Sequence, residues 1–135
     1  MAIVISPELD ARLRKETVLW LTSVRADGTP QPTPVWFLWD GKCFLIYSQP
    51  KARKVGNLKA NPKVALHLNT DESGERVVVF WGTARIDPQA PAAKKVNAYL
   101  EKYRQGIADI GLTPDSFSSE YSLSIRVIPE RIREE

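Results

Sequence analysis

Cysteine and histidine are almost absent from this sequence, which has one of each, Cys43 and His67. A single cysteine excludes an internal disulfide framework and a cysteine-based zinc site. A single histidine leaves no legible Ser-His-Asp arrangement. Long apolar runs are missing too, because stretches such as 35–38 and 77–81 fall far below the ~20 residues that a membrane span needs. No G-x-G-x-x-G motif or phosphate-binding loop of the Walker type is present.

The start of the chain also lacks the apolar core of a signal peptide, since Pro7 and Glu8 follow early. We therefore expect a cytoplasmic protein with a reduced thiol. The 135 residues, 43% of them hydrophobic and 26% charged, indicate one globular domain over residues 1–135. The net charge of +3 is too small to indicate nucleic acid as a partner, and we expect neither nucleic acid nor a membrane.

Local patterns predict a mainly antiparallel β structure. Strands are expected over residues 17–25, 31–39, 42–48, 63–70, 76–86 and 121–128. Asp27-Gly28 and Asp40-Gly41 are turn signals, and two such hairpins in succession favour a meander. Prolines 30, 32 and 34 place the second strand at an edge or a bulge, and Gly82 predicts a bulge in the long fifth strand.

Helices are expected between these strands. The Ser6-Pro7-Glu8 start predicts a helix over 7–15, and a basic helix over 51–60 ends at Asn61-Pro62. Asp87-Pro88 indicates a further helix over about 89–104, followed by loop over 106–119. About six antiparallel strands with two or three helices favour an α+β fold, a small barrel closed on itself with helices at its ends.

The sequence offers no clear side-chain catalyst. His67 lies in the middle of an alternating strand and is best interpreted as structural. Cys43 is interpreted as a small apolar filler within a strand. We therefore expect no catalytic side chain and no metal site, so that the chemistry would belong to a cofactor.

One segment is suited to holding an anion. A strand ends at Ser48, and Arg53 and Lys54 open the helix that follows. A hydroxyl, a guanidinium, an ammonium and free helix N–H groups would then surround one point, and all four favour phosphate. A solvated basic helix face is the alternative interpretation.

A second segment is suited to a flat ring. Residues 31–37 combine a stiff, proline-rich backbone with bulky apolar side chains, and could present fixed backbone groups to the edge of a heterocycle. The alternative is an edge strand that prolines protect from aggregation. In the predicted meander this strand neighbours the one ending at Ser48, which would bring the two candidate sites together.

Three stretches, "DGTPQPTPVWFLWDG", "LIYSQPKARKVGNLKANPKVAL" and "FWGTARI", resemble the split-barrel flavoproteins related to pyridoxamine 5′-phosphate oxidase. Their order runs over residues 15–130. The Pro-Val-Trp-Phe strand and the Arg-Lys-Val-x-Asn-Leu helix start resemble the short branch of deazaflavin (coenzyme F-420) dependent reductases. The printed sequence has no long C-terminal segment of the kind with which the true oxidases bind their substrate, so we do not expect that oxidase activity.

This resemblance implies a six-stranded antiparallel split β-barrel of the FMN-binding type. It also implies a homodimer with two cofactor sites at the subunit interface, in which Trp36 and Trp81 could be dimer core. The cofactor-binding positions that it implies are Gln31, Thr33, Pro34, Val35, Ser48, Arg53, Lys54 and Asn57.

The identity of the cofactor stays open at this stage. A deazaflavin carries a polyanionic oligoglutamate tail, and Lys51, Lys59 and Lys63 could extend a basic track for it or be ordinary surface lysines. The first hypothesis is a reductase that transfers hydride from reduced coenzyme F-420 to an unsaturated organic substrate. The second is an FMN-dependent reductase or oxidase, and the third is a non-catalytic flavin- or tetrapyrrole-binding protein. A nucleic-acid-binding barrel comes last.

Overall fold

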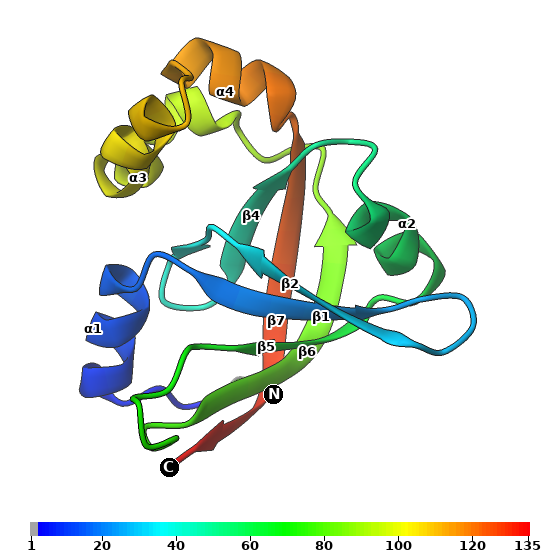
Figure 1. The fold of residues 1–135 in the computed structure, drawn as a ribbon, viewed down its shortest axis with the longest axis vertical. Helices are drawn as coiled ribbons and strands as arrows, with labels where there is room; N and C mark the ends of the chain where they lie inside the picture. The colour runs from blue at the N-terminus through cyan, green and yellow to red at the C-terminus, as the bar shows by residue number, and fades with distance from the viewer. Residues whose placement is uncertain (1–2) are drawn as a thin grey trace.

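A computed structural model describes residues 3–135 as one antiparallel sheet with helices packed around it (Figure 1). The strands are β1 (Leu19–Val24), β2 (Pro30–Val35), β3 (Leu38–Trp39), β4 (Phe44–Ser48), β5 (Lys63–His67), β6 (Val78–Ile86) and β7 (Leu123–Glu134). The helices are α1 (Pro7–Lys15), α2 (Arg53–Ala60), a short 3₁₀ helix η1 (Ala93–Lys95), α3 (Asn97–Asp109) and α4 (Pro114–Glu120).

The sheet has the order β2-β1-β5-β6-β7-β4-β3 and curls into a split barrel. Its two end strands, β2 and β3, are consecutive in the chain but do not pair with each other. The expected α+β split barrel is therefore confirmed. The structure has seven strands where six were predicted, because the run over 31–39 breaks at Trp36 and Phe37.

The edge position predicted for the proline-rich strand is confirmed. β2 pairs only with β1, from Leu19 opposite Val35 to Val24 opposite Pro30. Residues two apart in a strand direct their backbone groups to the same side. Prolines 30, 32 and 34 thus remove three N–H donors from one side of β2, and the unpaired edge is the side that tolerates this loss.

The bulge predicted at Gly82 is also present. The register between β6 and β7 shifts between Trp81 and Gly82, where Pro129 of β7 lies opposite. A β-carbon on Gly82 would lie 2.3 Å from the carbonyl oxygen of Ile128. This close approach lets β7 continue past Pro129, so the strand is longer than the predicted 121–128.

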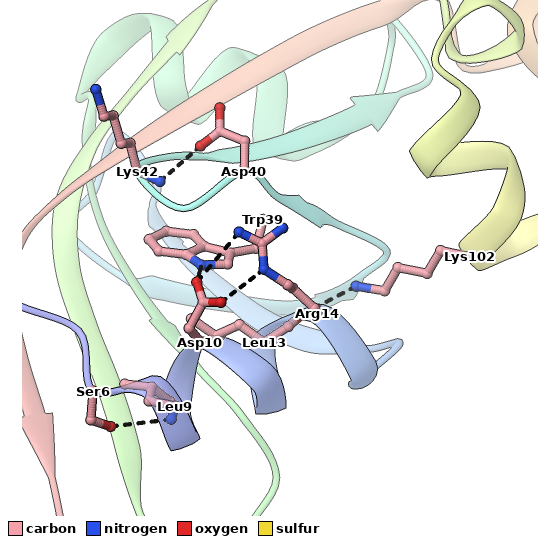
Figure 2. A network of polar contacts seen from close by, with 9 residues as sticks. All are labelled: Ser6, Leu9, Asp10, Leu13, Arg14, Trp39, Asp40, Lys42 and Lys102. Carbon is pink, nitrogen blue, oxygen red and sulfur yellow. Dashed lines mark hydrogen bonds and ion pairs between the residues drawn. The ribbon is translucent and has the colours of Figure 1, made fainter.

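Helix α1 closes one end of the barrel, with Leu9 and Leu13 fully buried in its core. The helix begins where predicted, because the Ser6 side chain accepts from the amide of Leu9. Asp10 accepts from the indole of Trp39 at 2.9 Å and from Arg14 at 2.9 Å (Figure 2). Hydrogen bonds from Arg14 and Trp39 lower the pKa of the Asp10 carboxyl.

Helices α3 and α4 form a separate cap over the outer side of β4 (Figure 1). All five residues of β4 are buried, because Phe44 and Ile46 face the barrel while Leu45 and Tyr47 lie under the cap. A second hydrophobic cluster therefore forms between strand and cap. It contains Leu45, Tyr47, Ala93, Tyr99, Leu100, Tyr103, Ile107 and Phe117.

Two predictions for the cap segment were wrong. The helix expected over 89–104 is a 3₁₀ turn followed by α3, because Asp87 caps only a turn through the amide of Gln89. The loop expected over 106–119 is largely helical. α3 continues to Asp109 and stops at Gly111, whose φ of 81° suits glycine, with Leu112 donating to the carbonyl of Ile107. A Thr113–Ser116 capping box then starts α4. Within residues 3–135 no helix has the length and apolarity to cross a membrane.

Two of the glycines inside regular elements, Gly82 in β6 and Gly56 in α2, should respond to alanine in opposite directions. Gly82→Ala should destabilise the fold by about 1–3 kcal/mol, because the new methyl group collides with backbone. Gly56→Ala, in exposed α2 with nothing within 4 Å of the added carbon, should stabilise it by roughly 0.5–1 kcal/mol. Urea unfolding measures both. Equal effects of the two substitutions would contradict the close strand approach at the bulge.

Candidate functional site

A pocket of about 270 Å³ lies where the end of β2, the first turn of α2 and the cap meet. Its walls are mostly aromatic and apolar, and they contain a single charged side chain. The lining residues are Pro34, Val35, Trp36, Tyr47, Lys54, Tyr99, Ile110, Phe117 and Tyr121. The predicted meander was wrong, because β2 and β4 are not neighbours in the sheet. The curl of the barrel nevertheless brings the end of β2 and the start of α2 to the same pocket.

Lys54 is the charged group of this pocket. Its side chain is half-buried, and burial lowers the pKa of its ammonium group. Within residues 3–135 it makes no ion pair within 4.0 Å, and no hydrogen bond of its side chain is found. The first turn of α2 also lacks a side-chain cap at Ala52. An unpaired cation beside open helix amides is a site that favours an anion.

Trp36 forms one wall of the pocket. Its indole stacks on Tyr103 at 4.7 Å between ring centroids and on Phe117 at 5.8 Å, with interplanar angles of 8° and 15°. Phe117 continues the stack onto Tyr121 at 4.6 Å. A β-carbon on Gly106 of α3 would lie 3.1 Å from the indole, so glycine at this position lets the helix pack directly on the ring. The wall is thus a ladder of nearly parallel aromatic rings.

Gln31 and Asn57 lie outside the pocket lining and bind each other. The Asn57 side-chain amide donates to the Gln31 side chain at 2.7 Å and to the Ser23 hydroxyl at 3.0 Å. This network joins α2 to the β1–β2 hairpin. It therefore fixes the distance between the helix start and the edge strand, which are the two halves of the candidate site.

The remaining predicted residues have different surroundings. Pro34 and Val35 line the pocket with Lys54, and Thr33 is half-buried on the same strand. Arg53 is exposed at the α2 start, outside the pocket lining. Ser48 is buried, and its hydroxyl donates to the carbonyl of Gln49 at 2.9 Å. The structure thus brings together Pro34, Val35 and Lys54, and it does not bring the Ser48 hydroxyl into the pocket. Cofactor binding by these residues stays a prediction.

Two phenols of the pocket, those of Tyr47 and Tyr99, are held neutral. Burial raises the pKa of Tyr47 to about 12, and the Tyr47 hydroxyl donates to the carbonyl of Pro91 at 2.8 Å. Burial raises the pKa of Tyr99 further. Neither group supplies negative charge near pH 7, so the electrostatic character of the site is set by Lys54.

Sequence reasoning missed the contribution of the cap to this site. Tyr99, Ile110, Phe117 and Tyr121 come from a segment that was expected to be partly loop. Two sequence patterns could have revealed the helices of the cap. Tyr99, Tyr103 and Ile107 recur at a spacing of four, which is typical of a helix face. Thr113-Pro114 followed by Ser116 is a helix start.

The other singled-out residues lie away from the pocket. His67 stacks on Trp20 at 6.2 Å on the outer face of the sheet. Trp81 lies on the same face, beneath the guanidinium of Arg131 at 4.7 Å. Cys43 is half-buried, and burial raises the pKa of its thiol. Residues 3–135 contain no group of three histidine, cysteine or acidic side chains that could hold a metal ion.

Comparison with known proteins agrees with this geometry. An F420 reductase structure is 27% identical, with a TM-score of 0.73, and the match covers 96% of this chain and 98% of that chain. A conserved hypothetical protein from Mycobacterium tuberculosis is 22% identical, with a TM-score of 0.75 and coverage of 98% and 86%. The heme storage protein HutZ from Vibrio cholerae is 19% identical, with a TM-score of 0.68 and coverage of 98% and 95%. No curated protein matches at a significant level.

A sequence-family profile gives the assignment. The profile described as pyridoxamine 5′-phosphate oxidase matches residues 5–134, nearly the whole chain. The structural matches share the fold of this chain over nearly its whole length. The chain therefore belongs to the pyridoxamine 5′-phosphate oxidase family of split-barrel proteins.

Proposed function

We propose that this protein binds a flavin-type cofactor, coenzyme F-420 in preference to FMN, and transfers hydride to an unsaturated organic substrate. The observation that carries the proposal is the half-buried, unpaired Lys54 in the same pocket as the free edge of β2. The F420 reductase among the structural relatives supports the choice of cofactor.

The residues present fit the cofactor's anionic end. Keeping an ammonium half-buried without a counter-ion costs free energy, and a bound phosphate would offset that cost through charge-assisted hydrogen bonds. The N–H groups of Arg53 and Lys54, which no side chain caps, would add further donors, whereas the amide of Val55 already donates to the carbonyl of Ala52. Lys54 and the helix start are therefore the proposed phosphate site.

The edge of β2 fits the ring system. Pro34, Val35 and Trp36 line the pocket from a strand end that has no further strand beside it. The indole of Trp36, held by its stacks on Tyr103 and Phe117, offers an apolar contact at this edge. We assign the ring to this wall and the substrate to the space under the cap, beside Ile110 and Tyr121.

The tail of the cofactor distinguishes F-420 from FMN. Lys51 and Arg53 are exposed beside the α2 start and could contact a polyanionic tail that leaves the pocket. Lys59 lies at the other end of α2, and Lys63 already pairs with Glu130 at 3.6 Å. The basic track proposed here is thus shorter than the one that the sequence suggested.

The chain itself needs to do little chemistry in this proposal. A deazaflavin supplies hydride and reacts poorly with oxygen, because carbon replaces the reactive ring nitrogen. Trp36 and the β2 edge would orient the ring, and the cap would exclude water from the face where the substrate lies. No acidic side chain lines the pocket, so an apolar or anionic substrate fits better than a cationic one.

Titration of the cofactor-free protein with F-420, FMN and haemin tests the function. We expect micromolar or tighter binding of F-420, and reduction of enone or quinone acceptors by the reduced complex. Preference for FMN would move the protein to a flavin-dependent reaction. Tight haemin binding without turnover would favour a storage role like that named for HutZ. Binding of none would overturn the proposal.

Lys54→Met should weaken binding of both F-420 and FMN by roughly 10- to 100-fold, the effect of losing a hydrogen bond to a charged group. The same substitution should leave the cofactor-free protein as stable or more stable, because it removes a buried charge. Isothermal titration and urea unfolding measure the two effects. Lys59→Met, exposed at the far end of the same helix, is the matched control. Equal affinities of the two variants would contradict the phosphate site.

A homodimer that completes the site is part of the proposal. A pocket of about 270 Å³ lies at the lower limit of small-ligand sites, roughly 300 Å³, so a tricyclic cofactor needs a further wall. The outer strip of β1, β5 and β6 is suited to a second copy, because apolar side chains gather there. The strip consists of Trp20, Thr22, Ala65, His67, Val79 and Trp81, all half-buried in a single copy.

Trp81→Glu should therefore convert a dimer into a monomer and weaken cofactor binding together with association. Analytical ultracentrifugation at micromolar concentration, combined with the cofactor titration, measures both. Ala108→Glu, on the exposed surface of the cap, controls for the change of charge, because it also adds a single negative charge. If the wild type is monomeric and binds the cofactor with full affinity, the proposed dimer is wrong. The assignment of the cofactor to the pocket is then unaffected.

A further inference from the structure

The break between β2 and β3 leaves the backbone N–H and C=O of Phe37 without a strand partner, and helix α3 supplies the partners. The amide of Phe37 donates to the Tyr103 hydroxyl at 2.8 Å. The Tyr103 hydroxyl lies 2.7 Å from the carbonyl oxygen of Thr17 and 3.0 Å from that of Phe37, and its one proton can serve either. A buried backbone group must be paired, so these contacts stand in for the missing ladder.

Lys102, one residue before Tyr103, completes this arrangement. Its ammonium donates to the carbonyl oxygen of Phe37 at 2.9 Å and lies 3.7 Å from the centre of the Phe37 ring. It also reaches the carbonyl of Leu13 at 3.4 Å, in the last turn of α1 (Figure 2). Among residues 3–135 no carboxylate lies within 4.0 Å of it. Its charge is held by two carbonyls, an aromatic face and the negative end of a helix.

The same bend carries the wall of the candidate cofactor site. Trp36 precedes Phe37, and the two side chains point to opposite sides, Phe37 into the barrel core and Trp36 into the cap. The Trp36 indole lies on Tyr103 and against Gly106, which come from the helix that also carries Lys102. A movement of the Phe37 peptide would therefore move the ring that lines the pocket.

We propose that Lys102 is a positioning residue of the cofactor site, whose ammonium holds the Phe37 peptide and thereby fixes Trp36 against the ligand. The inference rests on the proposed function, because it assigns a role in that site. The inference also goes beyond the proposed function, because Lys102 lies outside the pocket lining and would not contact the bound cofactor. Its consequence is a ligand affinity that depends on the charge of a lysine outside the site.

The charge of Lys102 changes within an accessible pH range. Burial lowers its pKa to about 8, and the nearby charge of Glu16 opposes this shift. The other charged or titratable groups around it are Arg14 and Lys15 on α1, with Asp10 bound to Arg14, and Glu101 and Tyr103 on α3. Below pH 8 the ammonium contacts are complete. Above pH 8 the neutral amine keeps only a weaker hydrogen bond.

Stability and affinity should then change in opposite directions as the pH rises. The pKa of Lys102 is lower in the folded than in the unfolded chain, so between about 8 and its ordinary value near 10.4 the unfolded chain binds more protons. The contribution of Lys102 to stability therefore increases over that range. A purely structural lysine would give this increase alone, whereas a positioning lysine also gives a loss of affinity.

The test compares wild type, Lys102→Arg and Lys102→Met between pH 6.5 and 9.5. Arginine stays charged throughout, so the ratio of wild-type to Lys102→Arg affinity for F-420 and FMN cancels the titration of the ligands and of Lys54. We expect this ratio to fall by roughly 5- to 10-fold with a midpoint near pH 8, the effect of one charge-assisted contact. Lys102→Met should bind weakly at every pH. A constant ratio would overturn the proposal, whether or not the methionine variant folds.

A measurement without ligand separates this inference from the proposed function. The NMR signals of the Phe37 amide and of the Trp36 indole N–H should both shift with a midpoint near pH 8 in the wild type, and neither should do so in Lys102→Arg. If they shift and no cofactor binds, the proposed function fails while the coupling of Lys102 to Trp36 stands. If a cofactor binds and neither signal responds, the role of Lys102 is wrong and the cofactor assignment stands.

Discussion

The pairing of the backbone N–H and C=O of Phe37 with helix α3 is the contact on which the rest of this structure depends. A sheet that curls into a barrel without joining its end strands must leave a gap, and here the gap falls between β2 and β3 at residues 36–37. Backbone groups at this gap have no neighbouring strand. Tyr103 and Lys102 supply the missing partners from a helix more than sixty residues further along the chain. The cap is therefore part of the barrel's closure as well as a cover on its outside.

This closure also creates the candidate site. Side chains on either side of the bend enter two different hydrophobic clusters, so one short segment ties the barrel core to the space under the cap. The pocket opens where these clusters meet the start of α2, and the Gln31–Asn57 contact sets the position of that helix. Burial of aromatic rings gives the walls their rigidity. Lys54 has no ion-pair partner among these walls within residues 3–135. Burying its charge costs free energy in the cofactor-free protein, and a bound anion would offset that cost.

Much of the barrel could be predicted from local sequence, because local chemistry determines it. Ser6-Pro7 marked the start of α1, alternate prolines marked an edge strand, and Gly82 marked a bulge. The spacing of Lys54 after a strand end also predicted that this lysine opens a helix, and it lies in the first turn of α2. The cap was harder to predict, because Gly106 and Gly111 suggest a loop, although the first packs against Trp36 and the second ends α3. Two contacts could not be predicted, because they depend on tertiary packing and leave no local sequence pattern. The Ser48 hydroxyl donates to the carbonyl of Gln49, and the Phe37 amide donates to the Tyr103 hydroxyl.

Amide hydrogen exchange at Phe37 tests the central claim most directly. The account predicts that this amide, although outside every strand, is protected as strongly as amides of the central strand β6, and that Tyr103→Phe removes its protection while leaving that of β6 intact. The lost phenol takes away the only acceptor found for the amide within residues 3–135. Exchange of Phe37 in the wild type at the rate of the exposed 71–75 turn would contradict the account, because the cap would then not close the barrel.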